Sequence, residues 1–317
     1  MADGSAQALE RAKFSDPQVT ADGSLRATVG LQKLETLWIN TGTLCNIECA
    51  NCYILSSPSN DALVYLKLSE VERYLDEIAE CGLGTREIAF TGGEPFMNPD
   101  MIGMAESALN RGFDVLILTN AMRPMMRPTV REGLLALRKV HGERLTLRVS
   151  IDHYQAKFHD AERGEGTFEI TLDGMRWLSA NGFRMAAAGR TMWGESDDQA
   201  RSGFARLFDR EGFDIDTEDP SQLVLFPEMD EAVEVPEITT QCWGILGKSP
   251  DSVMCSNARM VVKRRGADAP VVLACTLLAY DPQFELGRTL AEASRPVSLN
   301  HRHCAKFCVL GGARCSA

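Results

Sequence analysis

The sequence predicts an α/β fold followed by a small cysteine-rich α+β extension. Short apolar runs alternate with amphipathic stretches about every 30 residues through the middle of the chain, which is typical of repeated strand and helix units. After Pro227 this alternation stops, and six of the ten cysteines follow. With 44% apolar and 24% charged residues in a chain of 317, the composition is that of a folded protein with a substantial core.

The strands of the α/β part are predicted from apolar, β-prone runs. In chain order they are Glu35–Asn40, Glu87–Thr91, Asp114–Thr119, Leu145–Asp152, Phe183–Met192 and Leu223–Phe226. Glycines stand where the helices between them should end, because glycine adopts the left-handed conformation of a helix C-cap at low cost. These glycines are Gly112, Gly182 and Gly212.

Start signals mark three of the helices. Ser69 with Glu72, and Ser196 with Gln199, have the spacing of a capping box. Asn98 followed by Pro99 predicts an N-cap and a first-turn proline for a helix over Met101–Arg111. The first helix should pack on the sheet through one apolar stripe. That stripe consists of Val71, Tyr74, Leu75 and Ile78.

Beyond Pro227 the clearest element is a hairpin. Its arms are Arg259–Lys263 and Val271–Ala274. Because Cys255 precedes the first arm and Cys275 follows the second, the hairpin should bring these two cysteines together. We therefore expect a polar N-terminal extension over 1–34, a core over 35–228 and a separate cysteine-rich domain over 229–317.

Charge and hydropathy exclude several classes of function. Lys and Arg total 33 and Asp and Glu total 44, so the net charge of −11 disfavours a general nucleic-acid binder. The longest apolar run, Phe113–Ala121, carries Asp114 and Asn120 and is too short to cross a bilayer. Met1–Gly30 lacks the apolar core of a signal peptide. We expect a cytoplasmic protein.

Ten cysteines are unusual for such a chain. Disulfide frameworks belong to short secreted proteins, so metal or cluster ligation is the better interpretation. Cys45, Cys49 and Cys52 lie on the loop between the first strand and the first helix. Three thiolates are one short of a closed tetrahedral or cubane site, and an open position indicates chemistry. Structural zinc is the alternative.

This C-x3-C-x2-C loop resembles that of the radical S-adenosylmethionine (SAM) superfamily. A second match, Thr91–Pro95, is similar to the family's GGEP motif. The resemblance covers about residues 35 to 228. It implies a partial (β/α)6 barrel in which Cys45, Cys49 and Cys52 hold a 4Fe-4S cluster, with SAM bound to the fourth iron. Members often have an aromatic residue or histidine before the third cysteine, whereas this chain has Asn51.

The same resemblance implies a SAM pocket at the strand ends. Its glycines let the backbone approach closely, and its glutamate receives the SAM ammonium. The implied residues are Tyr53, Gly92, Gly93, Glu94, Asn120, Ser150, Asp152 and Arg190. Substrate would lie above SAM, where loop residues are candidates to line its site. These are Arg123, Arg127, His153, Tyr154, Trp193 and Glu195, and the two arginines would suit an anionic substrate.

The C-terminal region resembles the twitch or SPASM extensions of radical SAM enzymes. The match lies in a cysteine before a hairpin, another after it and a terminal cysteine group. It implies one auxiliary 4Fe-4S cluster, with structural zinc as the alternative. The ligands would come from Cys255, Cys275, Cys304, Cys308 and Cys315. We expect His301 and His303 to be solvated neighbours and Cys81 to be a buried packing residue, and we assign no role to Cys242.

The resemblance implies an enzyme that cleaves SAM to a 5′-deoxyadenosyl radical and abstracts hydrogen from a small molecule or a peptide. An auxiliary cluster would assist by accepting an electron or binding substrate, and an external flavodoxin or ferredoxin would supply electrons. The alternatives are a radical SAM group-transfer enzyme and a non-catalytic iron-sulfur carrier or redox sensor. A SAM pocket weighs against the carrier.

Overall fold

The fold is built on one nine-stranded sheet within residues 12–227 and 233–311, which are the residues that the computed structural model describes. The strand order is β10-β9-β8-β2-β3-β4-β5-β6-β7. Six strands run parallel in chain order, as the alternation predicts. They are β2 (Thr36–Asn40), β3 (Glu87–Thr91), β4 (Asp114–Thr119), β5 (Leu145–Ser150), β6 (Arg184–Thr191) and β7 (Leu223–Pro227).

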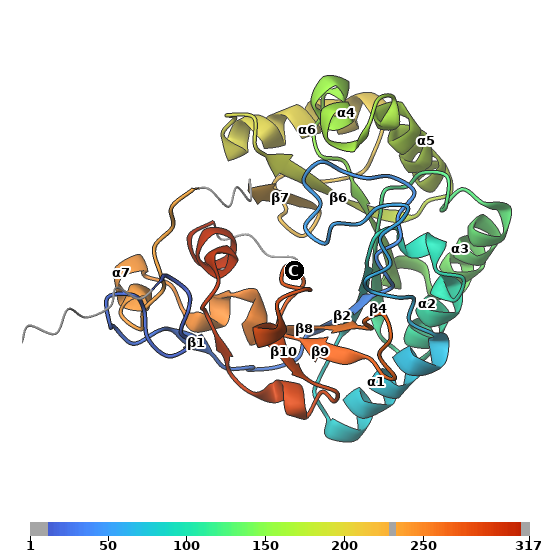
Figure 1. The fold of residues 1–317 in the computed structure, drawn as a ribbon. Coiled ribbons are helices and arrows are strands. Elements are labelled where there is room, and N and C mark those ends of the chain that lie inside the picture. The colour runs from blue at the N-terminus through green and yellow to red at the C-terminus, as the bar shows by residue number, and fades with distance from the viewer. Residues whose placement is uncertain (1–11, 228–232, 312–317) are drawn as a thin grey trace, which may run out of the picture.

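Helices follow the parallel strands and cover the outer side of the curved sheet (Figure 1). They are α1 (Leu68–Cys81), α2 (Met101–Asn110), α3 (Pro128–His141), α4 (Ala156–Arg163), α5 (Thr167–Ala180) and α6 (Asp197–Glu211). This curved parallel sheet with helices outside confirms the predicted α/β fold. The carboxyl ends of the six parallel strands open on one face, which is where such folds bind ligands.

Several local predictions are confirmed. Ser196 and Gln199 form a reciprocal capping box at the start of α6. Gly212 ends that helix with a φ of 72°, the left-handed conformation that glycine adopts most easily. The predicted stripe of α1 is buried against the sheet, and it consists of Val71, Tyr74, Leu75 and Ile78.

The predicted start of α1 is wrong. The helix begins at Leu68, before Ser69, so Ser69 and Glu72 lie inside its first turn. Glu70 accepts a hydrogen bond from the backbone N–H at the N-cap, and Asp100 of the next unit accepts one from the N–H of Leu68 (3.0 Å). A side chain distant in sequence therefore caps this helix.

The predicted N-cap of α2 is also wrong. Asp100 occupies that position, and Asn98 and Pro99 precede it. Asn98 is instead buried and donates from Nδ2 to the carbonyls of Thr41 (3.1 Å) and Leu66 (2.9 Å). It joins three segments beneath the strand ends, and its Oδ1 also accepts from the N–H of Asp100 (2.9 Å), so a tertiary role is added to a local one.

The C-terminal region extends the same sheet. The predicted hairpin is confirmed as β8 (Ala258–Val262) and β9 (Val271–Leu273), which pair antiparallel. β8 lies parallel to β2, and β10 (Glu285–Gly287) pairs with β9. The short helix α7 (Cys242–Leu246) precedes the hairpin, and a π-helix, Cys304–Leu310, follows it.

The N-terminal segment packs against this C-terminal region. β1 (Thr28–Val29) pairs antiparallel with β11 (Val297–Ser298). A buried ion pair between Arg26 and Glu237 adds to the contact. Within the described part of the chain, no helix has both the length and the hydropathy needed to span a bilayer.

Candidate active site

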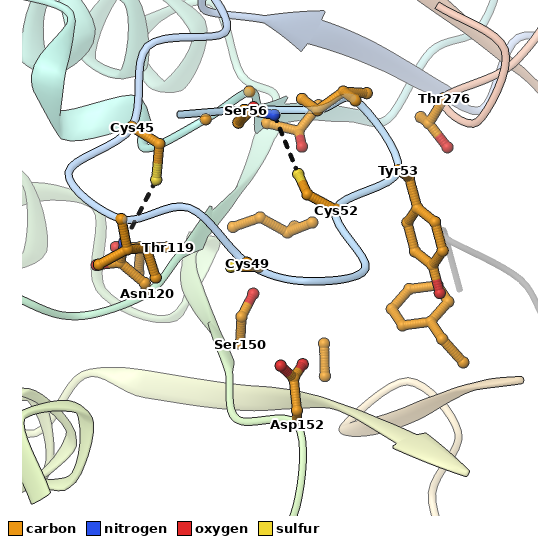
Figure 2. Close-up of a pocket in the computed structure, with 18 of the residues that line it drawn as sticks. Cys45, Cys49, Cys52, Tyr53, Ser56, Thr119, Asn120, Ser150, Asp152 and Thr276 are labelled. Atoms are coloured by element: carbon orange, nitrogen blue, oxygen red, sulfur yellow. Dashed lines mark hydrogen bonds between the residues drawn. The ribbon is translucent and has the colours of Figure 1, made fainter. Parts of the chain in front are cut away.

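A cavity of about 170 Å³ opens at the carboxyl ends of the parallel strands (Figure 2). The structure brings nearly all of the predicted catalytic-site residues to its wall. These are Cys45, Cys49, Cys52, Tyr53, Gly92, Gly93, Asn120, Ser150, Asp152 and Arg190. They come from five different segments, so the strand ends assemble the site as the topology requires.

Two glycines hold the cysteine loop against the end of β3. The backbone N–H of Gly93 donates to the carbonyl of Gly42 (2.8 Å). A Cβ at Gly93 would lie 2.3 Å from the carbonyl oxygen of Leu44, and one at Gly92 would lie 2.6 Å from that of Gly42. Both distances are too short for any side chain, so only glycine lets the two backbones approach.

The cysteine loop offers a donor set that fits an iron-sulfur cluster. Cys45, Cys49 and Cys52 surround one side of the cavity in Figure 2. Among the described residues no three His, Cys, Asp or Glu side chains gather tightly enough for a single metal ion. Thiols spread around a cavity instead suit a cluster, in which each thiolate binds a different iron.

Burial keeps the thiols of Cys45 and Cys49 protonated in the metal-free chain. Desolvation raises the pKa of Cys45 to about 12 and raises the pKa of Cys49 as well. Polar groups nonetheless face two of the sulfurs. The N–H of Ser56 donates to Cys52 Sγ (3.3 Å), and Asn120 Nδ2 lies 3.9 Å from Cys45 Sγ. A bound metal centre would remove the thiol protons and use these donors.

A buried network of charge forms the opposite wall. Asp152 accepts from Arg163 through both carboxylate oxygens (2.8 and 3.0 Å) and from Arg190 Nε (3.3 Å). Burial opposes ionisation of Asp152, but the charges of Arg163 and then Arg190 outweigh it and lower the pKa. Arg190 also donates to the carbonyl of Asn51 (2.7 Å), so the network fixes the cysteine loop.

Arg163 is a site residue that the sequence did not reveal. It ends α4, eleven positions after Asp152, where no motif marks it. The prediction that Arg190 approaches this site is met, but its guanidinium is shared with Asp152 and Asn51. Asn51 itself turns away and donates to Glu162 on α4 (2.9 Å).

Tyr53 supplies the aromatic surface of the cavity. The guanidinium carbon of Arg190 lies 4.9 Å from its ring centroid, which is cation–π geometry. Phe226 at the end of β7 meets the same ring edge-on at 6.0 Å. Phe226 in turn stacks on Phe307 of the π-helix at 5.5 Å. One line of rings therefore joins the cavity to the C-terminal region.

Glu94 lies behind the cavity wall instead of lining it. Its carboxylate accepts from Thr119 Oγ1 (2.9 Å) and from the backbone N–H groups of Asn120 (2.8 Å) and Phe96 (3.2 Å). Desolvation outweighs these hydrogen bonds and raises the pKa of Glu94 to about 7. Glu94 thus ties the GGEP turn to the end of β4.

A Glu94→Gln variant should change how stability depends on pH. The folded state holds a proton on Glu94 up to about pH 7, whereas the unfolded chain loses it near 4.5. The free energy of unfolding should therefore fall as pH rises through this window, with Glu94 contributing on the order of 3 kcal/mol. Denaturant unfolding of the metal-free chain from pH 4.5 to 7 should show a smaller fall in the variant. An equal fall in the free energy of unfolding in the parent and in the variant would contradict the raised pKa of Glu94.

The residues considered for a substrate site do not line the cavity. Arg127 donates to the carbonyl of Pro124 (3.1 Å), so it stabilises its own loop. His153 and Tyr154 both bond the carboxylate of Glu195 (2.9 and 3.0 Å). Arg123 and Trp193 also lie outside the cavity lining. The idea of an anionic substrate held by Arg123 and Arg127 therefore gains no support from their placement.

The second cysteine group meets at a separate small cavity of about 20 Å³. The hairpin brings Cys255 and Cys275 there, as predicted from its two arms. Four residues apart on the π-helix, Cys304 and Cys308 face the same cavity. Cys315 lies outside the described residues. Four described thiols thus surround one apolar space.

Two expectations about neighbouring residues are wrong. Cys81 is exposed, so the prediction of a buried packing residue is wrong: it is the last residue of α1, beyond the buried stripe that ends at Ile78. His303 is not a solvated neighbour, because its ring lines the small cavity and both ring nitrogens are buried without a partner among the described residues. Cys242 lies on α7 and accepts from the N–H of Thr239 (3.3 Å).

Comparisons with known proteins agree with this geometry. The family model described as "Radical SAM superfamily" matches residues 39–202. The antilisterial bacteriocin subtilosin biosynthesis protein AlbA of Bacillus subtilis is 30% identical over 154 residues, covering 47% of this chain and 32% of the relative. An AdoMet-dependent heme synthase of Methanosarcina barkeri is 34% identical over 135 residues, covering 42% and 36%. The chain thus matches about a third of each relative's length.

Solved structures share the fold. Streptococcus suis SuiB bound to S-adenosylmethionine aligns with a TM-score of 0.56 at 12% identity, covering 81% of this chain and 63% of SuiB. SuiB bound to its precursor peptide SuiA aligns with a TM-score of 0.55. The family match runs from the end of β2 into α6, over more than half of the sequence and through the cysteine loop and the glycine turn, and the chain belongs to the radical SAM superfamily.

Proposed function

We propose that this protein is an enzyme that cleaves SAM reductively and abstracts a hydrogen atom from its substrate. The supporting observation is the single cavity that combines the three thiols of the cysteine loop, the glycine turn and the buried charge network. When bound, the 4Fe-4S cluster and SAM supply the electron and the 5′-deoxyadenosyl radical. Cys45, Cys49 and Cys52 would hold that cluster.

The other residues of the cavity would position SAM and exclude water. Gly92 and Gly93 leave room for close approach of a ligand to the backbone. Ser150 and Asp152 offer polar groups to a ribose, and Tyr53 offers a ring face to adenine. Glu94 and Asn120 would hold the turn and the β4 end in place beneath the SAM ammonium. A dry, shaped site limits side reactions of a radical.

We further propose a twitch or SPASM-like domain over 229–317 that holds one auxiliary 4Fe-4S cluster. Support comes from the four thiols of Cys255, Cys275, Cys304 and Cys308 around one apolar cavity. Burial raises the pKa of Cys255 to about 12 and also raises those of Cys275 and Cys304, so these thiols need a metal to ionise. With four thiolates available, the site would be closed and would serve electron transfer.

The substrate is proposed to be a peptide or a small molecule that lies between the two cysteine sites. A third hollow of about 390 Å³ shares Cys52, Tyr53 and Leu277 with the SAM cavity and His303 with the small cavity. SuiB has been solved with a precursor peptide, and AlbA is named for bacteriocin biosynthesis, which favours a peptide. We propose a cytoplasmic location and a flavodoxin or ferredoxin as electron donor.

Anaerobic reconstitution tests both sites at once. The parent chain should bind about eight irons and, after reduction with SAM, form 5′-deoxyadenosine. A Cys45→Ala, Cys49→Ala, Cys52→Ala variant should keep about four irons and form none. Zinc in place of iron at the C-terminal thiols would contradict the auxiliary cluster. A fully loaded parent that leaves SAM intact would instead indicate an iron-sulfur carrier.

A further inference from the structure

Arg259 is a fully buried cation next to the C-terminal cysteine site. It lies on β8 with 0% of its surface exposed. Nε donates to the carbonyl of Ala293 (2.8 Å), and Nη1 donates to those of Cys255 (2.6 Å) and Ala258 (2.7 Å). Nη2 donates to the carbonyl of Arg295 (3.4 Å). Every one of these acceptors is an uncharged backbone group.

No carboxylate of the described residues forms an ion pair with Arg259. Arg26 and Arg190, which are also buried, each have one: Arg26 pairs with Glu237, and Arg190 pairs with Asp152. Carbonyl oxygens satisfy the donors of a guanidinium but do not neutralise its charge, and an unpaired buried charge costs several kcal/mol. The metal-free chain therefore carries a positive charge in its interior without a counter-charge on a described side chain.

The groups that could neutralise it are the cysteines. Arg259 Nη1 bonds the carbonyl of Cys255 (2.6 Å), and Cys255 lines the small cavity together with Cys275, Cys304 and Cys308. Four thiolates around an iron-sulfur core give a site of net negative charge, and reduction adds one more negative charge. When the thiols ionise and bind the cluster, the site would thus supply the missing negative charge.

We propose that Arg259 is the counter-charge of the auxiliary cluster and raises its reduction potential. This inference rests on the proposed auxiliary cluster. A fixed positive charge stabilises the more negative, reduced state more than the oxidised one, and low-dielectric surroundings strengthen the effect. The site would then suit acceptance of one electron from a substrate radical that also loses a proton. The reduced cluster would pass this electron to the oxidised form of the proposed flavodoxin or ferredoxin.

Arg259 acts here as a positioning residue and not as a catalytic one. All of its bonded donors face backbone carbonyls, and none of its surface is open to a substrate. Two roles can therefore be separated by experiment. A purely structural role needs the guanidinium to hold the carbonyls of Cys255 and Ala293, whereas the electrostatic role needs a positive charge.

The test measures the reduction potential of the C-terminal cluster alone. The Cys45→Ala, Cys49→Ala, Cys52→Ala background removes the first cluster, and an EPR-monitored titration then follows the second. Arg259→Met should favour the oxidised state at least tenfold, a shift of about 59 mV to more negative potential for one electron. Arg259→Lys should stay close to the parent. Arg201→Met on α6 is a control that should leave the potential unchanged.

Each outcome decides between the two roles. An unchanged potential in a loaded Arg259→Met protein would overturn the proposal. If that variant does not load, Arg259→Gln replaces it as the neutral form, since its amide still donates to carbonyls. If Arg259→Lys binds iron and neither Arg259→Met nor Arg259→Gln does, the result would support the need for a positive charge. If none of the three variants binds iron, the proposal would be overturned. Absence of iron from the triple-cysteine parent would instead refute the auxiliary cluster itself.

Discussion

A Gly93→Ala variant is expected to lose the cluster of the cysteine loop and nearly all SAM cleavage. The new methyl group would lie 2.3 Å from the carbonyl oxygen of Leu44, which is backbone and cannot rotate away. Leu44 directly precedes Cys45, so the clash must displace the first thiol of the loop. A displacement of about 1 Å at a reacting centre costs on the order of 100-fold in rate. Iron content and 5′-deoxyadenosine yield after reduction would measure the loss.

Gly244→Ala provides the matched control for this substitution. Gly244 is exposed on α7, and a Cβ there meets no atom within 4 Å. The control should retain the parent's iron and activity. In Gly93→Ala the irons of the C-terminal cysteines should also remain, which separates loss of one site from misfolding. Full loading and cleavage by Gly93→Ala would show that the two backbones need not meet this closely.

An Asp152→Ala variant is expected to show the largest loss of stability. Removal of the carboxylate leaves Arg163 and Arg190 as unpaired cations, and their side chains are only 10% and 9% exposed. Breaking a buried ion pair from one side costs about 3 to 5 kcal/mol. Denaturant unfolding of the metal-free chain at pH 7 should show this decrease. SAM binding should weaken too, because Arg190 also holds the loop carbonyl of Asn51.

Asp197→Ala is the control for an exposed pair of the same residue types. Asp197 bonds Arg201 one helical turn away (2.6 Å), and its side chain is 58% exposed. Its loss should cost only about 0.5 kcal/mol. Equal costs in the two variants would mean that the Asp152 network is no stronger than a surface pair.

Stability should also depend on pH through Asp152. Because its folded pKa lies below the ordinary value, the contribution of its ion pairs is fully present above about pH 4, where the unfolded carboxylate is already charged. This contribution should disappear as pH falls through the lower, folded pKa. The stability difference between parent and Asp152→Ala should therefore shrink in acid. A constant difference down to pH 2 would contradict the ionised network.

Local patterns predicted most of the strands and one of the two capping boxes. The strand Glu87–Thr91 is observed with the predicted bounds, because its apolar run is bounded by polar residues and needs no distant partner to be recognised. The start of α1 was mispredicted for the opposite reason. The N–H of its first residue, Leu68, is satisfied by Asp100, 32 residues away, and no local signal records that contact.

The cysteine loop and the glycine turn, which meet at the cavity, were both identified from the sequence alone. Each is a short motif whose residues act together within one loop, so spacing is sufficient to identify it. The hairpin likewise predicted that Cys255 and Cys275 meet, because antiparallel arms bring their flanking residues together.

Only the tertiary structure decided how buried charges are compensated. Arg163 and Arg190 reach Asp152 from different elements, and Arg259 is surrounded by carbonyls, with no ion pair to a carboxylate of the described residues. β8 lies beside β2 although some 220 residues separate them, which the strand patterns do not encode. Motifs are local in sequence, whereas burial and electrostatic pairing depend on which distant segments meet, and that is settled only when the chain folds.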